Sequence, residues 1–452
     1  MNPKSRVGAS TLLALLLVGG AAQARGQDRE LAPPVAFWRT LGDTTLERLV
    51  GEVVKSNHDV VAARARLRGA RASRLQAALD FAPTVTASAS YTRQRIVSTA
   101  FSGGLAAALP DQNVWDAGLQ LSWELDVFGR IRKTTQGRGA LIGAAEEDVR
   151  DLQVLLASEL AIAYFDLRGA QDRLQVARRN AENQQHTLDM TVQRLEAGRG
   201  NEFDSERARA LLNSTLAGIP ELEASIAAVE HRIAVLVGQP ATGLGQDSTE
   251  RPVLQDLPDS ILVPNPDAVV RLRPDVRSAE RLVSAGQAFV GAAKAAYLPQ
   301  ISIGGAAGYV GNSFDAMGSS NTPRYAIGPV ISWPALNLGR VKADVDVARA
   351  QEAESEAYYH KTQLQAYEEI ATSVVAYNKA RRSLDFLEAA ARASERAAGL
   401  ARLRFDEGAT DFLQVLDAER TMLEAQDRLA GGRTAATTRL VTLYRALGGA
   451  LP

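Results

Sequence analysis

A long, proline-free helix with a seven-residue apolar repeat is the feature that most constrains the fold of this chain. Between Arg130 and Gly198 there is no proline, and apolar residues recur at every seventh position: Leu160, Leu167, Leu174, Ala181, Leu188 and Leu195. This period is typical of helices that wind around one another in a left-handed supercoil. A helix over residues 130–197 would be roughly 100 Å long at about 1.5 Å per residue. It is therefore too long for the interior of an ordinary globular domain, whose helices average about 11 residues.

The same pattern returns 210 positions later, which indicates a tandem duplication. The matching apolar positions are Ile370, Tyr377, Leu384, Ala391, Ala398 and Phe405. The five residues Arg404-Phe-Asp-Glu-Gly408 correspond to Arg194-Leu-Glu-Ala-Gly198. We predict one intertwined body rather than separate domains, with a first repeat over 41–237, a linker over 238–266 that is rich in Pro, Gly and Asp, and a second repeat over 267–449.

Composition excludes several classes of function. The net charge is −1 with the two signs interspersed, so we expect no nucleic-acid partner. The absence of cysteine excludes disulfides, thiolate metal sites, a catalytic thiol and lipid attachment to a cysteine. No phosphate-binding loop, His-x-x-x-His pair or Gly-x-Ser-x-Gly elbow occurs. We therefore expect no enzyme activity, no cofactor and no metal.

A glycine motif in the long helix needs separate mention. Gly137, Gly139 and Gly143 superficially resemble a nucleotide-binding loop, but they lie inside the long helix rather than between a strand and a helix. We expect them instead to allow another helix to approach closely.

The N-terminus has the features of an export signal. Lys4 and Arg6 precede an apolar run over 11–18, and Ala22-Gln-Ala24 is a small-x-small cleavage site. The apolar run is too short to span a membrane, which needs about 20 residues. We predict a signal peptide over 1–24 and an extended polar leader over 25–40, which contains Pro33-Pro34.

Each repeat begins with helices and continues with strands. In the first repeat we predict a short helix over 41–56 that opens at Asp43 or Thr44, and a second helix over 59–81 that Pro83 stops. The period then changes to two, with alternating runs over 84–92 and 117–126 separated by a Gly- and Ala-rich loop over 102–111. These runs are expected to form a hairpin with one apolar and one polar face.

The second repeat keeps this order. A helix over 274–298 precedes alternating runs over 301–309 and 325–333, with a loop over 311–323 between them. In both repeats the long helix ends at a glycine, Gly198 or Gly408, as suits a left-handed helix cap. A further helix follows each glycine, over 202–237 and 411–447. Each repeat thus carries a strand hairpin at one end of the long helix and a helical hairpin at the other.

Four strands per chain are too few to close a barrel. An exposed sheet edge is a liability in water and is not tolerated in hydrocarbon. The alternation suits a lipid-facing surface outside and a wet lumen inside, with interface aromatics at Tyr91, Trp123, Tyr309, Tyr325 and Trp333. Closure then requires symmetric assembly. Two chains would give eight strands and a filled barrel, whereas three would give twelve and an opening, and we favour three. A small soluble sheet packed on helices is the alternative.

Several motifs resemble a known family. Ser122-Trp-Glu-Leu-Asp-Val-Phe-Gly-Arg130, Phe412-Leu-Gln-Val-Leu-Asp-Ala-Glu-Arg420 and Leu443-Tyr-Arg-Ala-Leu-Gly-Gly449, with Arg404-Phe-Asp-Glu-Gly408, are similar to segments of outer-membrane efflux proteins of the TolC/OprM type, on the NodT-like branch. The match spans about residues 40–450 and recurs in both repeats. The resemblance implies a mainly α fold with a small β part. It also implies a homotrimer with a 12-strand transmembrane barrel in the outer membrane and a long periplasmic helical tunnel.

The resemblance also implies partners and site residues. Such a channel is the exit duct of a tripartite pump, with a periplasmic adaptor protein and an inner-membrane RND-type transporter. Carried over by motif, a periplasmic gate falls at Leu413, Asp417 and Arg420. Helix packing for Leu413 and a solvated or capping role for Asp417 are the alternatives. The hairpin tips for adaptor contact are Arg194, Gly198, Arg404 and Gly408. The junction between barrel and tunnel falls at Phe128, Gly129, Arg130, Leu338, Gly339 and Arg340.

The sequence departs from the family pattern at one place. Many members of this branch carry a lipidated cysteine after the signal, whereas residues 22–26 here contain none, so the barrel and helices are expected to hold the protein in the membrane unaided.

Two other functions are also compatible with the sequence. Besides an efflux channel, the chain could be a type I secretion duct for polypeptides or an exported coiled-coil scaffold that has no barrel.

Overall fold

The computed structural model describes residues 43–95, 97–98, 107–108, 111–241, 257–263 and 265–449, all within one body. The predicted signal peptide and leader lie outside the described residues. The helices are α2 (Thr44–Ser56), α3 (His58–Leu79), α4 (Arg130–Glu196), α5 (Glu202–Leu236), α6 (Pro266–Leu272), α7 (Pro274–Ala295), α8 (Leu338–Asp406) and α9 (Phe412–Ala446). The strands are β1 (Thr84–Gln94), β2 (Val97–Ser98), β3 (Ala107–Ala108), β4 (Gln112–Leu125), β5 (Gln300–Gly311) and β6 (Pro323–Ser332).

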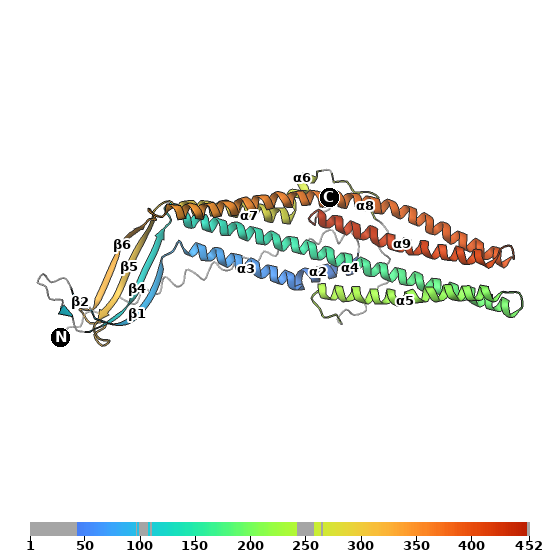
Figure 1. The fold of residues 1–452 in the computed structure, drawn as a ribbon, viewed down its shortest axis with the longest axis horizontal. Helices are drawn as coiled ribbons and strands as arrows, with labels where there is room; N and C mark the ends of the chain where they lie inside the picture. Colours follow the sequence, from blue (N-terminus) through green and yellow to red (C-terminus); the bar gives the residue numbers. More distant parts are fainter. Residues whose placement is uncertain are drawn as a thin grey trace, which may run out of the picture. The chain divides into compact units, whose positions relative to one another are not determined.

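The sheet and the helices follow the same spatial order. The four long strands form one antiparallel sheet in the order β1-β4-β5-β6. The helices that connect directly to these strands pack side by side as α3-α4-α7-α8, and α5 and α9 pack against the far halves of α4 and α8 (Figure 1). The predicted strand hairpins and helical hairpins are therefore confirmed. The short helix α6 was not predicted, because it begins at Pro266, where the predicted linker ends.

The seven-residue repeat faces the helix contacts. Of the twelve repeat positions, Leu160, Ala181 and Leu188 on α4 are buried, as are five of the six on α8, while the remaining positions are half-buried. Apolar side chains gather in three clusters: one where α2 packs on α4, one where α8 meets α9, and one between the two helical hairpins. The repeat therefore defines the packing faces of the helices.

Glycines permit the close packing of α4 on α7. A Cβ atom added to Gly137 would lie 2.6 Å from the ring of Phe289 on α7, and one added to Gly143 would lie 3.3 Å from the side chain of Arg281. A contact as close as the first is essentially never adopted by a real side chain, so Gly137 is required for this approach. The expected role of the glycine motif is confirmed at these two positions.

Each repeat contains an equivalent hydrogen bond from a tryptophan at the end of a strand. The indole Nε1 of Trp123 donates to the carbonyl oxygen of Phe81 at 2.8 Å, and that of Trp333 donates to the carbonyl oxygen of Tyr297 at 3.1 Å. Trp333 lies 210 positions after Trp123, and Tyr297 lies 216 positions after Phe81. The pairing of β1 with β4 maps onto that of β5 with β6 under the same two shifts. The strand pairings of the two repeats thus correspond residue by residue.

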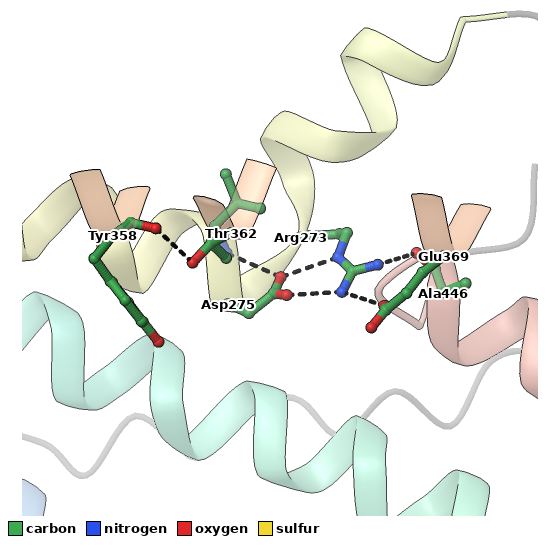
Figure 2. Close-up of polar contacts among 7 residues, drawn as sticks. Arg273, Asp275, Tyr358, Thr362, Glu369 and Ala446 are labelled. Carbon is green, nitrogen blue, oxygen red and sulfur yellow. Dashed lines mark hydrogen bonds and ion pairs between the residues drawn. The ribbon is translucent and has the colours of Figure 1, made fainter. Parts of the chain in front are cut away.

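In each repeat, the residue just before α3 or α7 donates a hydrogen bond to the last carbonyl of α5 or α9, respectively. In the first repeat, the Asn57 Nδ2 group donates to the carbonyl oxygen of Leu236 at 2.9 Å. In the second, Arg273 takes this place, and its Nη1 donates to the carbonyl oxygen of Ala446 at 2.8 Å (Figure 2). The last carbonyls of a helix have no partner within the helix and carry partial negative charge, so a cation suits this position.

Arg273 also joins α7 to α8. Its Nε and Nη2 groups donate to both carboxylate oxygens of Asp275 at 3.0 and 2.7 Å, and Nη2 also donates to Glu369 on α8 at 2.8 Å (Figure 2). Only 7 % of Arg273 is exposed. One buried guanidinium therefore fixes the start of α7, the middle of α8 and the end of α9.

Replacing Arg273 should destabilise the second repeat. The change Arg273→Met keeps an unbranched side chain similar to the aliphatic part of arginine but removes the guanidinium that binds the Asp275 carboxylate and the Ala446 carbonyl. We expect a loss of about 3–5 kcal/mol, as for removal of one partner from a buried ion pair. Thermal unfolding of the detergent-solubilised protein, followed by circular dichroism, measures this. The exposed neighbour Arg271 provides the control, and an unchanged midpoint in Arg271→Met beside a lowered one in Arg273→Met is the expected result.

A carboxyl next to this arginine has a raised pKa. Burial raises the pKa of Asp151 on α4 to about 6 from 3.8, and the nearby carboxylate of Asp275 adds to the effect, while Arg273 opposes it. A carboxyl whose pKa is raised in the folded state binds more protons there than in the unfolded chain. Its ionisation therefore reduces the free energy of unfolding as the pH rises from about 4 to 6.

Asparagine at position 151 should remove this penalty. We expect Asp151→Asn to raise the free energy of unfolding by about 1–3 kcal/mol above pH 6. The gain should shrink as the pH falls from 6 to 4, because Asp151 is then protonated in the folded state and only partly ionised in the unfolded chain. Thermal midpoints measured from pH 4 to pH 8 test this, and a gain that does not depend on pH would contradict it.

Candidate functional site: the two sheet faces and the hairpin tips

One face of the sheet is apolar across all four strands. Val85 lies opposite Leu121 in the β1–β4 pairing, Leu121 lies opposite Gly305 in the next, and Gly305 lies opposite Ile327 in the third. Every second residue of each strand adds to this face, and its members on β4 are Trp115, Ala117, Leu119, Leu121, Trp123 and Leu125. Many of the side chains are exposed, including 73 % of Ile327 and 47 % of Leu119. No helix or loop of the described chain covers them, which excludes a small sheet packed on helices.

The opposite face is polar and built from small residues. Thr86 lies opposite Gln120, and Thr84 lies opposite Ser122. An open groove of about 580 Å³ runs over these residues and the glycines of β5. Near the loop end, Arg324 on β6 forms an ion pair with Asp116 on β4 at 2.5 Å, reaching across β5. A surface of this kind can line a water-filled passage.

Aromatic side chains lie at both ends of the apolar face. At the helix end, Trp123 and Trp333 make the indole hydrogen bonds described above. At the loop end, the ring of Trp115 contacts the rings of Tyr91 and Phe314, with centroid distances of 4.7 and 5.4 Å. Tyr309 and Tyr325 are at the same end, 45 % and 87 % exposed. Sequence reasoning identified five of these residues but missed Trp115 and Phe314, although Trp115 continues the alternation of β4.

The distance between the two aromatic groups suits a membrane. Trp115 and Trp123 are eight positions apart on β4, as are Tyr325 on β6 and Trp333, which directly follows that strand. This spacing corresponds to about 26 Å along the strand at about 3.3 Å per residue. Outer-membrane barrels have an apolar band about 25 Å tall between two aromatic girdles, crossed by tilted strands. The tilt shortens the projected distance, so the two groups fit near the boundaries of such a band.

The first junction between strand and helix is tightly organised. Asp126 accepts hydrogen bonds from the backbone N–H groups of Ile131 and Arg132 at 2.8 and 3.1 Å, and so caps the start of α4. Gly129 has φ +79°, a conformation that favours glycine. Arg130 forms a two-pronged ion pair with Glu124 on β4, at 2.9 and 2.6 Å. Phe128 beside them is 44 % exposed. The chain thus turns from sheet to helix at a fixed angle.

The second junction is built differently. Leu336, which is 99 % exposed, stands at the place of the capping residue Asp126, and no side chain caps α8. α8 begins two positions earlier than α4 does, so Leu338, Gly339 and Arg340 lie inside the helix. Gly339 consequently lacks the positive φ of Gly129. The two sequence motifs match, but only the first forms a capped turn.

The two hairpin tips have the same helix-ending motif. The N–H of Arg199 donates to the carbonyl of Arg194, and the N–H of Ala409 donates to that of Arg404, both at 2.8 Å. Gly198 and Gly408 have φ values of +68° and +73°, as this motif requires. The structure also brings the tips together, because the Arg194 guanidinium lies 4.1 Å from the centre of the Phe405 ring and 3.7 Å from Asp406.

The predicted gate residues share an exposed side of α9. Leu413 is 48 % exposed. Asp417 lies one turn further along and forms an ion pair with Arg420 at 2.9 Å, with both side chains well exposed. In a single chain, therefore, none of the three is buried by helix packing, and the negative charge of Asp417 is partly balanced by its neighbour.

A buried polar cluster near the tips was missed by sequence reasoning. Glu419 on α9 is 1 % exposed, and its Oε1 accepts hydrogen bonds from Arg402 on α8 at 2.8 Å and from Thr187 on α4 at 3.2 Å. It occupies a core position of the apolar repeat, between the buried Val415 and Met422. An acidic residue at a core position was the available signal. The cluster ties the second helical hairpin to α4.

None of the helices in the described ranges contains a stretch long and apolar enough to cross a membrane.

Comparison with known proteins identifies the family. The family model described as outer membrane efflux protein matches residues 49–239 and 266–449. Among solved structures, the outer-membrane channel OprN superposes with a TM-score of 0.85 at 39 % identity, over 91 % of this chain and 92 % of that one. The MtrE outer membrane channel of Neisseria gonorrhoeae superposes with a TM-score of 0.79 at 26 % identity, over 89 % and 88 % of the two chains.

Characterised relatives are similar over their whole length. The solvent efflux pump outer membrane protein SrpC of Pseudomonas putida is 28 % identical over 97 % of both chains. The outer membrane protein OprJ of Pseudomonas aeruginosa is 28 % identical over 99 % of this chain and 96 % of its own. The chain therefore belongs to the outer membrane efflux protein family and is an efflux channel protein of the outer membrane.

Proposed function

We propose that three copies of this chain form the exit duct of a tripartite pump, which receives small molecules from an inner-membrane RND-type transporter through a periplasmic adaptor. The observation that carries the proposal is the four-stranded sheet, which has one largely apolar face, one polar face and two open edges. In a single chain the apolar face and the edges would be exposed without partners, whereas a barrel shared by several chains needs an apolar outer face, a polar inner face and edges that can pair. The polar face would line the duct, and the apolar face would contact lipid.

The geometry of the edges supports ring closure. β1 and β6 are the outer strands, and they run in opposite directions because all three pairings between them are antiparallel. When β6 of one copy pairs with β1 of the next, the new pairing is again antiparallel. A head-to-tail contact of this kind forms a ring when the rotation between copies closes. Three copies give twelve strands and leave an opening, whereas two would give a filled barrel.

The outer helices repeat this arrangement. α3 and α8 are the two ends of the helical layer, and both carry large apolar side chains that nothing in the described chain covers. On α3 these are Val61, Leu75 and Leu79, and on α8 they include Val347, Tyr358, Leu364, Val375 and Phe386. Neighbouring copies would bury them and continue the layer into a closed tunnel wall.

The far end of the tunnel would be closed by the gate residues. Three Leu413 side chains around the axis would form an apolar constriction, and three Asp417 carboxylates would concentrate negative charge there. The hairpin tips at Gly198 and Gly408, with Arg194 and Arg404, would contact the adaptor. A wide duct of this kind selects poorly among solutes, so specificity would belong to the transporter.

The nature of the transporter decides between the two channel functions. The relatives named as efflux pump components support an RND-type transporter and small-molecule cargo. A secretion duct for polypeptides would instead associate with an ABC exporter. Affinity purification of the tagged channel after cross-linking in its own bacterium distinguishes them by the inner-membrane protein that is recovered.

Opening the gate should increase conductance. In planar bilayers, we expect Asp417→Asn, alone or with Leu413→Ala, to raise the single-channel conductance, because the tip would close less tightly. Leu272→Ala, an exposed leucine at the end of α6, is the control and should behave as the unchanged protein. Equal conductance in the double variant and the unchanged protein would rule out these residues as the gate.

A charge on the apolar face should prevent barrel assembly. Leu119 lies midway between Trp115 and Trp123, so Leu119→Arg would place an arginine near the middle of the membrane at a cost of about 2–4 kcal/mol per copy. The neighbouring Gln120 points to the polar face, and Gln120→Arg is the matched control. We expect the first variant to lose carbonate-resistant, SDS-resistant oligomer from outer membranes and the second to keep it. Equal loss in both would contradict the assignment of the two faces.

A further inference from the structure

We propose that α8 of one copy packs against α3 of the next in the same register in which α4 packs against α7 within the chain, and that Lys361 there faces Asp59 of the neighbouring copy. This inference rests on the proposed trimer and adds the residues at the seam between copies. It follows from the internal duplication, because the contact between the first and second repeats serves as a template for the contact between the second repeat and the next first repeat.

The template is the seam between α4 and α7. The Ser278 hydroxyl on α7 donates to Asp148 on α4 at 2.5 Å, and Arg277 pairs with Glu147 at 2.8 Å. Further toward the sheet, Gly137 makes room for Phe289. The two helices are antiparallel, and these contacts fix their register along about three turns.

Two constant differences in residue number relate the α4–α7 seam within the chain to the α8–α3 seam between copies. Residues of α4 and β4 correspond to residues of α8 and β6 that lie 210 positions later, and residues of α7 and β5 correspond to residues of α3 and β1 that lie 216 positions earlier. Asp148 and Ser278 thus convert to Tyr358 and Ala62. Glu147 and Arg277 convert to Ala357 and Val61, and Gly137 converts to Val347.

The side chains at these converted positions fit an apolar seam. Tyr358, Val347 and Val61 are 52 %, 58 % and 46 % exposed in the chain, and Ala357 and Ala62 are also exposed. The ion pair of the internal seam is replaced by a valine facing an alanine. On α3 the small residues Ala62, Ala65, Gly69 and Ala72 follow one side of the helix, where they allow α8 to approach closely.

One charged position changes sign between the two seams. Asp151 and Asp275 each lie three residues from the Asp148–Ser278 contact, and because the two helices are antiparallel, both lie further from the sheet on the same seam. Asp275 also adds to the raised pKa of Asp151. The converted positions are Lys361 on α8 and Asp59 on α3. Both side chains are exposed, and neither has an ion-pair partner among the described residues. A repulsive pair inside the chain thus becomes an attractive pair between copies.

The same shifts join the sheet edges correctly. Leu121 lies opposite Gly305 within the chain, and this pair converts to Ile331 on β6 and Ala89 on β1 of the next copy. Likewise, Trp123 and Ile303 convert to Trp333 and Ala87. All four converted residues belong to the apolar face. A register displaced by one residue would place polar residues on the lipid side, so the two shifts, which come from the β1–β4 and β5–β6 pairings and the indole hydrogen bonds, also give the edge between copies an apolar lipid side.

Cysteine cross-linking tests the register directly, because the chain has no cysteine of its own. The double variant Ala62→Cys/Tyr358→Cys, oxidised in outer membranes, should give covalent dimers and trimers on denaturing gels. The equivalent internal pair, Asp148→Cys/Ser278→Cys, should cross-link without a change in mass. The displaced pair Ala62→Cys/Gln365→Cys lies on the same side of α8 but about 10 Å further along at about 1.5 Å per residue, and it should not react.

Charge reversal tests the ion pair. Lys361→Glu should reduce the amount of SDS-resistant trimer by roughly three- to tenfold, since three exposed pairs per trimer become repulsive. Adding Asp59→Lys should restore most of it. Loss without restoration would overturn the pairing of Lys361 with Asp59.

The outcomes separate this inference from the proposed function. If the unchanged protein forms a conducting trimer, but the displaced pair cross-links and the Ala62/Tyr358 pair does not, the register is wrong and the proposed function stands. If the unchanged protein forms no closed oligomer in the membrane, the proposed trimer fails and this inference fails with it.

Discussion

Unpaired backbone groups at the two edges of the sheet are the constraint on which the rest of the structure depends. An N–H or C=O group that faces hydrocarbon has no partner, so a four-stranded sheet with lipid on one side must be closed by further strands. The chain supplies only four, with edges of opposite direction, and this makes repetition around an axis the natural solution. The aromatic side chains at both ends of the apolar face then limit the depth at which the sheet can lie in the membrane.

The helices extend the same cyclic arrangement away from the membrane. Each strand continues into a helix of the layer α3-α4-α7-α8, so the order of the sheet is carried into the tunnel wall. The seven-residue repeat keeps apolar side chains at the contacts over the length of α4 and α8, where no single domain core could reach. Gly137 leaves room for the ring of Phe289, so that α4 and α7 can pack closely near the sheet.

Polar contacts give the two repeats different properties within one architecture. The last carbonyl of α5 accepts a hydrogen bond from the neutral Asn57 side chain, whereas the last carbonyl of α9 accepts one from the charged Arg273. Arg273 also binds the carboxylates of Asp275 and Glu369, and Glu419 is buried between the two hairpins near their tips. Buried charges depend on their partners far more than exposed ones do, so these two sites couple the second hairpin to the rest of the chain.

The sequence by itself determined every feature that depends on local periodicity or on a single residue type. Neighbouring residues largely determine the local conformation of the chain. The alternation in β1 and β4 therefore predicted the strands, the apolar repeat through Leu160 and Ile370 predicted the long helices, and Gly198 predicted a hairpin end. Only the tertiary structure decided contacts between distant segments, such as Arg273 on Ala446 and Glu419 on Thr187. A charged residue carries no local sign of the carbonyl or carboxylate it will meet more than a hundred positions away. Its role is therefore fixed only when packing brings the partners together.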